Sequence, residues 1–249
     1  LYVFYVKRWD IKRQMRREML RWCERTKGGK VIFFYNFTAL TVLPELKRKF
    51  KDVKACLLVT DLPEYMAADN SLLTRLNKKI SSIWGTSDKS HFNFVDGYIL
   101  LAPGMRERLP MDGKPWIQVE GIYNPEDDKA LAEKTAEKVV LYTGNLGRRY
   151  GLPELLEAFK RIDNNEYRLW ICGTGDGLND VRRYETLDAR ISYLGIFPRA
   201  DVIKLQKKAT LLINPRHSAD EYTIYSFPSK TMEYMASGTP TLMSRLKSI

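Results

Sequence analysis

Short apolar runs alternate with amphipathic segments along the first half of the chain. The apolar runs cover residues 30–36, 53–61, 95–104 and 116–122, and charged residues flank them, as is typical of buried strands. Residues 40–50 are predicted to form a helix between the first two runs. Residues 10–30 read as a basic amphipathic helix that ends at Gly28 and Gly29. This strand–helix–strand order favours a parallel sheet covered by helices.

The second half repeats the alternation more clearly. Strands are predicted over residues 138–144, 167–177, 189–197, 210–216 and 239–244, and helices over 151–162 and 198–209 and from about Pro228. Between the halves, residues 125–138 are acidic, polar and poor in aromatic side chains. We therefore predict an α/β protein of two domains, residues 1–125 and residues 126–249, each with a parallel sheet covered by helices.

Composition narrows the classes of partner. The chain has 249 residues, 44% of them hydrophobic and 29% charged, which is typical of a soluble globular protein. Its net charge of +11 indicates an anionic partner such as a phosphorylated small molecule or an anionic membrane. We expect no nucleic-acid partner, because no basic module interleaved with exposed aromatics is recognisable.

Cysteine and histidine usage argues against a metal site. Cys23, Cys56 and Cys172 lie far apart without a CxxC pair, and only two histidines are present. We expect neither zinc nor a disulfide framework, and a reducing cytoplasmic location. Because the chain begins at Leu1 and stops at Ile249 just after a predicted strand, we expect a fragment of a longer protein.

Ligands of parallel α/β sheets bind at the carboxyl ends of the strands, and unusual residues gather there in the second half. The first set is the loop "TGNLGRR", with Gly144, Asn145, Gly147, Arg148 and Arg149. Small residues let backbone N–H groups approach a phosphate, and arginine adds bidentate donors. A plain turn with two solvated arginines is the alternative.

The next two strand ends are less specific. "CGTGDG" contains Gly173 and Gly175 but has Leu178 where a dinucleotide fingerprint needs its last glycine, so it indicates a tight turn or a close ligand approach. Ile196 and Phe197 lie at the end of the next predicted strand, where backbone groups could recognise a base edge. A helix start at Pro198 explains them equally.

The stretch "YSFPSKTMEYMASGTP" is the most informative. A helix starting at Pro228 and ending before Gly238 would place Lys230 and Glu233 on one side, one turn apart. The free N–H groups of its first turn and Lys230 favour an anion, and Glu233 could accept two ribose hydroxyls. An i,i+3 ion pair worth about 0.3 kcal/mol is the alternative. That alternative would leave unexplained an exposed Phe–Pro turn and the acidic loop before it.

Together with the preceding "LLINPR" and "YTGNLGRRYGLPELLEAF", this stretch resembles the retaining family-4 glycosyltransferases of GT-B fold. The similarity is greatest to bacterial enzymes that build capsule or other surface polysaccharides. It implies two Rossmann-like domains that face a cleft, transfer with retention and without a required metal, and a saccharide or lipid-linked acceptor on the first domain. No cofactor is implied beyond the donor substrate, which we expect to be a uridine diphosphate sugar.

The resemblance also implies residue roles. Glu233 corresponds to the ribose-binding glutamate, while Lys230 and Arg149 correspond to the diphosphate grip. The family's second glutamate, eight residues upstream, is replaced by Tyr225, so we assign sugar binding to Glu221. The full set expected at the donor is Arg149, Lys230 and Glu221 as catalytic residues, with Gly144, Asn145, Gly147, Arg148, Gly173, Gly175, Ile196, Phe197, Tyr225, Ser226, Phe227, Pro228, Ser229 and Glu233 as binding residues. Asp61, at a strand end, is an acceptor-side candidate or a simple turn residue.

The predicted function is glycosyl transfer in surface polysaccharide synthesis. The alternatives are a non-catalytic partner that binds sugar nucleotides and a nucleotide-sugar epimerase of the same fold. Residues 72–84 place Leu72, Leu76, Ile80 and Trp84 at helical spacing with lysines largely off that face. Such a helix either packs on the core or lies on an anionic membrane, which would make the protein peripheral to the inner face of the cytoplasmic membrane.

Overall fold

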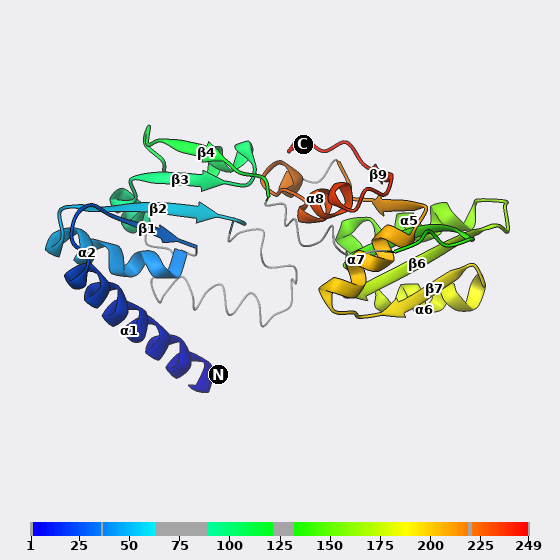
Figure 1. Cartoon of the computed structure of the whole chain (residues 1–249), viewed down its shortest axis with the longest axis horizontal. Coiled ribbons are helices and arrows are strands. Elements are labelled where there is room, and N and C mark those ends of the chain that lie inside the picture. The colour runs from blue at the N-terminus through cyan, green and yellow to red at the C-terminus, as the bar shows by residue number, and fades with distance from the viewer. Residues whose placement is uncertain (1, 36, 63–88, 122–131, 219–220, 249) are drawn as a thin grey trace. The chain divides into compact units, whose positions relative to one another are not determined.

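The computed structural model describes residues 2–35, 37–62, 89–121, 132–218 and 221–248 (Figure 1). The chain divides into two compact units, Leu1–Glu120 and Gly121–Ile249. The boundary predicted at residues 125 and 126 lies outside the described residues, as do residues 72–84. Within the described part, no helix is long and apolar enough to cross a membrane.

The first unit contains one parallel sheet in the order β1-β2-β3-β4. Its elements are α1 (Tyr2–Arg25), β1 (Lys30–Phe34), η1 (Phe37–Val42), α2 (Leu43–Lys49), β2 (Val53–Val59), η2 (Lys89–Phe94), β3 (Gly97–Leu100), η3 (Pro103–Arg108) and β4 (Trp116–Gln118). A two-point ion pair joins α1 to α2, with both Arg16–Glu45 contacts at 2.6 Å. The four strands and the basic helix predicted for this half are confirmed, and α1 begins before the predicted start.

The second unit contains a five-stranded parallel sheet in the order β7-β6-β5-β8-β9. Its elements are β5 (Lys138–Asn145), η5 (Arg148–Tyr150), α5 (Leu152–Lys160), β6 (Tyr167–Thr174), α6 (Leu178–Leu187), β7 (Ile191–Gly195), α7 (Arg199–Lys208), β8 (Leu211–Asn214), η6 (Glu221–Ile224), α8 (Ser229–Ala236) and β9 (Thr241–Met243). The chain runs from β5 outward to β7 and then returns to the other side of β5 for β8. The sheet therefore reverses its direction of growth between β5 and β8, where ligands bind in such folds.

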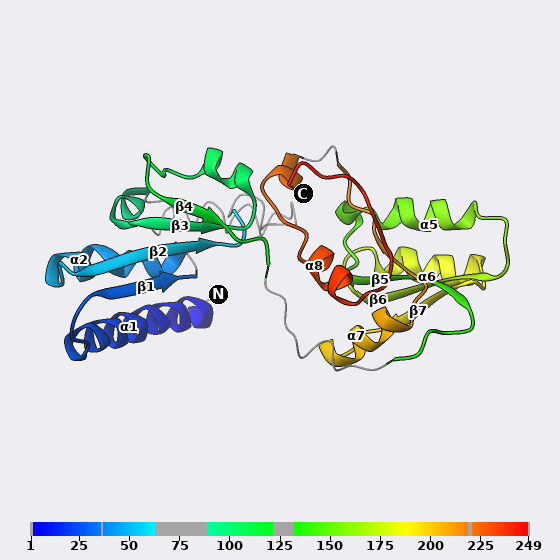
Figure 2. The same cartoon turned by 45° about the horizontal axis from the view of Figure 1, so that its top comes forward.

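Alternation along β5 gives this sheet two apolar layers. Leu141 and Val139 pack with Leu212 and Tyr234 on one face. Tyr142 packs on the other face with Leu156 and further residues of α5 and α6. Helices α5 and α7 accordingly lie on opposite sides of the sheet (Figure 2). The α/β class with two parallel sheets is confirmed.

One helix was missed by sequence analysis. Helix α6 buries only Val181 and Tyr184, and most of its other side chains are polar or charged. It begins after Gly177 without a side-chain cap, whereas a proline marks the start of α5, α7 and α8, so the sequence lacks a start signal for α6. Helix α8, by contrast, begins at Ser229 after Pro228, and Gly238 follows its end with a left-handed φ of 71°, as predicted.

Candidate functional site

The predicted residues of the second unit gather along one edge of its sheet. All five strands are parallel, so their carboxyl ends share an edge. Gly144 and Asn145 end β5, Gly173 lies near the end of β6, and Ile196 and Phe197 follow β7. The side chain of Ile196 is 70% exposed and that of Phe197 39%, so both could contact a ligand.

Two glycines let the ends of β5 and β6 meet. Gly173 has a φ of 138°, and a Cβ atom there would lie 1.8 Å from the carbonyl oxygen of Gly144. Gly175 is crowded as well, with a hypothetical Cβ 2.5 Å from the carbonyl carbon of Leu146. Close backbone packing thus accounts for Gly173 and Gly175 of "CGTGDG", in agreement with a tight turn. A close approach of a ligand at these glycines stays a prediction.

The loop after β5 is held by local hydrogen bonds. The amide of Gly147 donates to Asn145 Oδ1 at 2.8 Å, and the amide of Arg148 donates to Asp176 Oδ1 at 2.9 Å. The Arg148 guanidinium binds Asp180 of α6 through two contacts, at 2.6 and 3.2 Å. Arg148 therefore ties this loop to α6, and its role in donor binding stays a prediction.

Arg149 is held by aromatic rings. Its guanidinium carbon lies 4.4 Å from the ring centroid of Tyr222 and 5.2 Å from that of Tyr150. A second guanidinium, that of Arg216, lies 5.0 Å from the Tyr150 ring. Cation–π contacts thus fix the position of Arg149, and within the described part of the chain no ion pair with a carboxylate accompanies them.

Lys230 and Glu233 form the predicted pair on α8. Lys230 Nζ lies 2.7 Å from Glu233 Oε1, and the side chains are 35% and 17% exposed. The lysine chain passes over the end of β5, because a Cβ atom on Gly144 would lie 3.5 Å from Lys230 Cε. The pair therefore stands at the strand end where the sheet reverses its direction of growth.

A buried tyrosine anchors α8 to β5. The pairing of β5 with β8 ends at Leu141 and Leu212, so the backbone N–H and carbonyl groups of Thr143 have no partner on β8. Tyr234 OH takes that place: it accepts from the Thr143 amide at 2.9 Å and donates to the Thr143 carbonyl at 3.0 Å. Burial raises the pKa of Tyr234 to about 12, so the phenol stays protonated and keeps its donor.

Gln206 of α7 joins the same network. Its side-chain amide donates to Glu233 Oε1 and, at 3.1 Å, to Thr143 Oγ1. Sequence analysis missed Gln206, Thr143 and Tyr234. The available signal was the position of Gln206 three residues after Ile203, a polar residue on an otherwise apolar helix face.

The remaining predicted residues are placed as follows. Glu221 is exposed at the start of η6, and Tyr225 is buried, with its amide donating to the carbonyl of Tyr222 at 3.0 Å. Ser229 is exposed, and the carbonyl of Ser226 accepts from the Ser248 hydroxyl at 3.0 Å.

Two further placements complete the set. The expectation of an exposed Phe–Pro turn was wrong: Phe227 and Pro228 are both buried, because an apolar turn entering a helix packs inward. Asp61 is exposed just after β2 in the first unit.

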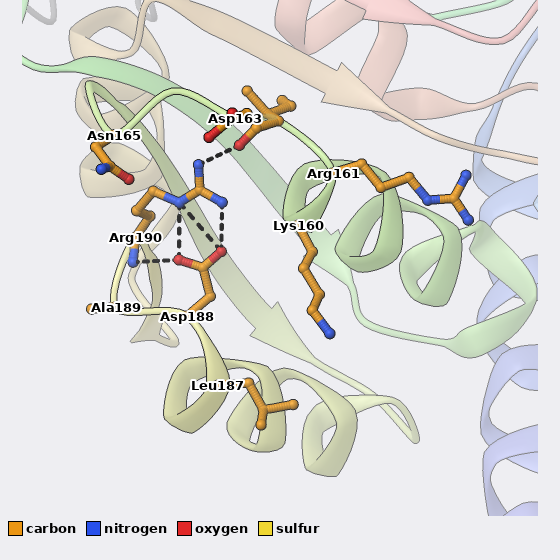
Figure 3. A pocket seen from close by; sticks show the side chains of 9 residues that line it. Lys160, Arg161, Asp163, Asn165, Leu187, Asp188, Ala189 and Arg190 are labelled. Atoms are coloured by element: carbon orange, nitrogen blue, oxygen red, sulfur yellow. Dashed lines mark hydrogen bonds and ion pairs between the residues drawn. The ribbon is translucent and has the colours of Figure 1, made fainter.

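A polar pocket at the opposite edge of this sheet has a structural explanation (Figure 3). Its volume is about 580 Å³, and its lining comprises Lys160, Arg161, Ile162, Asp163, Asn165, Leu187, Asp188, Ala189 and Arg190. Arg190 binds Asp188 at 2.7 Å and donates to the carbonyls of Ile162 and Asn164 at 2.6 and 3.0 Å. The guanidinium is thus occupied in joining two loops. In the part of the chain that the structure describes, no cluster of three His, Cys, Asp or Glu side chains suits a metal ion.

Comparison with known proteins supports a sugar-transfer site. The family model for "Glycosyl transferases group 1" matches residues 124–249. No match was found among curated proteins.

Solved structures share the fold at low sequence identity. Sucrose-phosphate synthase from Thermosynechococcus elongatus has a TM-score of 0.66 and 16% identity over 95% of this chain and 61% of its own. The lipopolysaccharide outer core galactosyltransferase WaaB, in its apo form, has a TM-score of 0.57 and 16% identity over 100% and 64%. Anabaena Alr3699/HepE in complex with UDP has a TM-score of 0.59 and 16% identity over 88% and 60%. The chain thus spans about three fifths of each of these proteins, and the predicted GT-B fold class is confirmed.

Proposed function

Because the chain belongs to the group 1 glycosyl transferases, we propose that it takes part in moving a sugar from a nucleoside diphosphate sugar to a saccharide or lipid-linked acceptor. The observation that carries this proposal is the placement of Lys230 and Glu233 on α8, against Gly144 at the end of β5. A cation and a carboxylate one turn apart match a diphosphate and a ribose in their charges and hydrogen-bonding groups.

In the proposed reaction, the bond between the sugar and the diphosphate breaks, and the sugar carbon forms a bond to a hydroxyl oxygen of the acceptor. The hydroxyl proton passes to the departing diphosphate, on which negative charge grows. Arg149, the first-turn N–H groups of α8 and Lys230 would stabilise that charge. Each is held before the ligand arrives, Arg149 by two rings and Lys230 by Glu233. Such preorganisation is most valuable in the transition state, when the charge is greatest.

We further propose retention of configuration, uridine as the base, and a role in surface polysaccharide synthesis at the inner face of the cytoplasmic membrane. The UDP named with the Anabaena structure supports uridine, and the lipopolysaccharide named with WaaB supports a surface polysaccharide. Retention and the membrane location rest on the resemblance of the sequence motifs alone. Glu221 is proposed to bind the donor sugar, and Asp61 to serve the acceptor. No metal is required in this scheme, because fixed cations face the diphosphate.

Calorimetry with UDP, GDP and ADP in the presence of EDTA tests the proposal. We expect UDP to bind, and Glu233→Ala to weaken binding by about ten- to a hundredfold, since it removes charge-assisted hydrogen bonds to the ribose. Glu166→Ala is the matched control, because Glu166 pairs with Lys138 at 2.6 Å at the opposite edge of the sheet. Equal affinity in the parent and Glu233→Ala would contradict the assignment of Glu233.

One observation favours a second function. Tyr225 stands where the family's upstream glutamate is expected, which is compatible with a partner that binds sugar nucleotides without catalysis. Incubation with UDP-sugars separates the two functions. Release of UDP, in the presence of saccharide acceptors or by hydrolysis, supports catalysis, whereas binding without release supports the non-catalytic partner. Conversion of the sugar without UDP release would indicate an epimerase instead.

A further inference from the structure

Gln206 has a buried side chain whose contacts point toward the candidate site. It lies on α7 with an exposed fraction of 0%, and its amide donates to both Glu233 Oε1 and Thr143 Oγ1. We propose that Gln206 is a positioning residue that orients the Glu233 carboxylate for the ribose of the donor. This inference rests on the proposed function, because it assigns Glu233 a ligand.

The orientation of the Gln206 amide follows from its neighbours. The ionised Glu233 carboxylate only accepts hydrogen bonds, so the NH₂ group of Gln206 must face it. The amide oxygen of Gln206 is then buried without a hydrogen-bond partner among the described residues. A buried polar atom without a partner is unfavourable, and an apolar side chain of similar size would avoid it. Stability of α7 alone therefore does not account for a glutamine here.

The remaining hydrogens of the network have a single arrangement. Tyr234 OH gives its hydrogen to the Thr143 carbonyl, so it can only accept from the Thr143 hydroxyl, at 3.2 Å. Thr143 Oγ1 consequently accepts from Gln206. Each donor has a defined acceptor, so the network links the backbone of β5 to the carboxylate of Glu233 without an alternative pattern.

The network leaves one carboxylate oxygen for a ligand. Lys230 and Gln206 both donate to Oε1 of Glu233, and no hydrogen bond from a described residue reaches Oε2. When Lys230 interacts with a diphosphate, Gln206 still holds Oε1. The carboxylate then keeps its direction, and Oε2 can accept a ribose hydroxyl without reorientation.

A double-mutant cycle on the full chain tests this role, with UDP affinity as the readout. Gln206→Met preserves the volume of the side chain and removes both hydrogen bonds. We expect it to weaken UDP binding by about tenfold in the parent background, through loss of one charge-assisted contact on Glu233. In the Glu233→Ala background the same change should alter affinity by less than about twofold, because the carboxylate it orients is absent. Equal losses in both backgrounds would overturn the proposal.

Ile203→Ala is the control for loosening of α7, since Ile203 is buried on the same helix. It should lower the melting temperature while leaving UDP affinity unchanged. Gln206→Asn is the second variant if Gln206→Met does not fold, because it keeps the amide but is too short to reach both acceptors. It should also weaken binding only when Glu233 is present. Absence of UDP binding by the parent chain would overturn the proposed function together with this inference, whereas binding with additive losses would overturn this inference alone.

Discussion

Lys230 and Arg149 present positive charge at the candidate site by different means. Lys230 is fixed by a carboxylate one turn away on its own helix, at 2.7 Å. Arg149 is fixed by the ring of its neighbour in the sequence, Tyr150, and by that of Tyr222, which comes from η6. A ring contact does not neutralise the arginine charge, so we expect Arg149 to be the stronger electrostatic partner for a diphosphate.

Removal of either cation should affect turnover more than binding. We expect Arg149→Ala and Lys230→Ala to lower kcat by about a hundredfold or more, and to weaken UDP affinity by less than that, because leaving-group charge is greatest in the transition state. Steady-state kinetics and calorimetry on the same variants check this. Lys138→Ala, which removes a lysine paired with Glu166 at the opposite edge, should change neither. Equal losses in kcat and affinity would argue against a leaving-group role.

For contacts between individual side chains of the candidate site, the sequence predicts only those between residues of one helix. Lys230 and Glu233 are three residues apart, so a helix brings them together wherever it packs. Gln206 and Glu233 are 27 residues apart and meet only because α7 and α8 cover the same face of the sheet. Tyr222 likewise reaches Arg149 through tertiary packing. Contacts of this kind depend on the fold and leave little local signal.

Among the elements, the junction of β5 and β6 is the most constrained. Gly173→Ala places a methyl group 1.8 Å from the Gly144 carbonyl oxygen and also forces alanine into a φ of 138°. We expect the free energy of unfolding to fall by at least about 3 kcal/mol, from backbone strain and from the clash. Gly238→Ala separates the two causes, because Gly238 has a φ of 71° but no atom within 4 Å of its hypothetical Cβ. It should cost about 1–2 kcal/mol. Chemical denaturation measures both, and equal losses would show that the clash is relieved.

The free energy of unfolding should depend on pH through one ion pair in the loop before β7, that of Arg190 with Asp188. Arg190 beside Asp188 holds the pKa of that carboxyl below its ordinary 3.8. The pair therefore stabilises the fold above pH 3.8, and its contribution is lost as pH falls through the lowered pKa. Arg190→Gln should reduce the free energy of unfolding by about 1–3 kcal/mol at pH 7, and the difference from the parent should shrink toward pH 3.

Urea denaturation between pH 7 and pH 3 measures this difference. Lys204→Gln removes an exposed partner of Asp201 and should change stability by less than about 1 kcal/mol at any pH. If the effect of Arg190→Gln were the same at pH 3 as at pH 7, the ion pair would not be its cause.

The elements themselves were largely predictable. Buried parallel strands give continuous apolar runs, and the nine described strands fall within predicted ones, apart from Asn145 at the end of β5. Helix α6 was missed because it starts after Gly177 without a proline or a capping side chain. The burial of Phe227 and Pro228 was missed because turn chemistry does not reveal packing. A sequence pattern shows the spacing of apolar residues within one segment. The exposure of a side chain depends on which other segments pack against it.

For the molecule as a whole, charge is the property that the candidate site does not account for. The net charge of +11 exceeds what a diphosphate neutralises. Basic residues are also spread over the first unit, where α1 carries many of them. A lipid-linked acceptor would place the protein near an anionic surface, which attracts such charge.

We therefore expect reversible binding to anionic membranes, in which residues 72–84 take part. Leucine, isoleucine and tryptophan at helical spacing would enter the interface, while Lys78 and Lys79 would approach the headgroups. The protein should sediment with anionic vesicles at low salt, and much less with neutral vesicles or at high salt.

The double change Lys78→Gln and Lys79→Gln should weaken binding to anionic vesicles by about 2 kcal/mol, or roughly thirtyfold, since each basic residue near the surface contributes about 1 kcal/mol. Lys207→Gln with Lys208→Gln removes the same charge from α7 and is the matched control. If the two double variants lose the same affinity, attraction is a property of net charge and residues 72–84 have no special part in it. If the parent stays in the supernatant with anionic vesicles at low salt, the apolar residues of 72–84 pack within the protein, and the acceptor need not be lipid-linked.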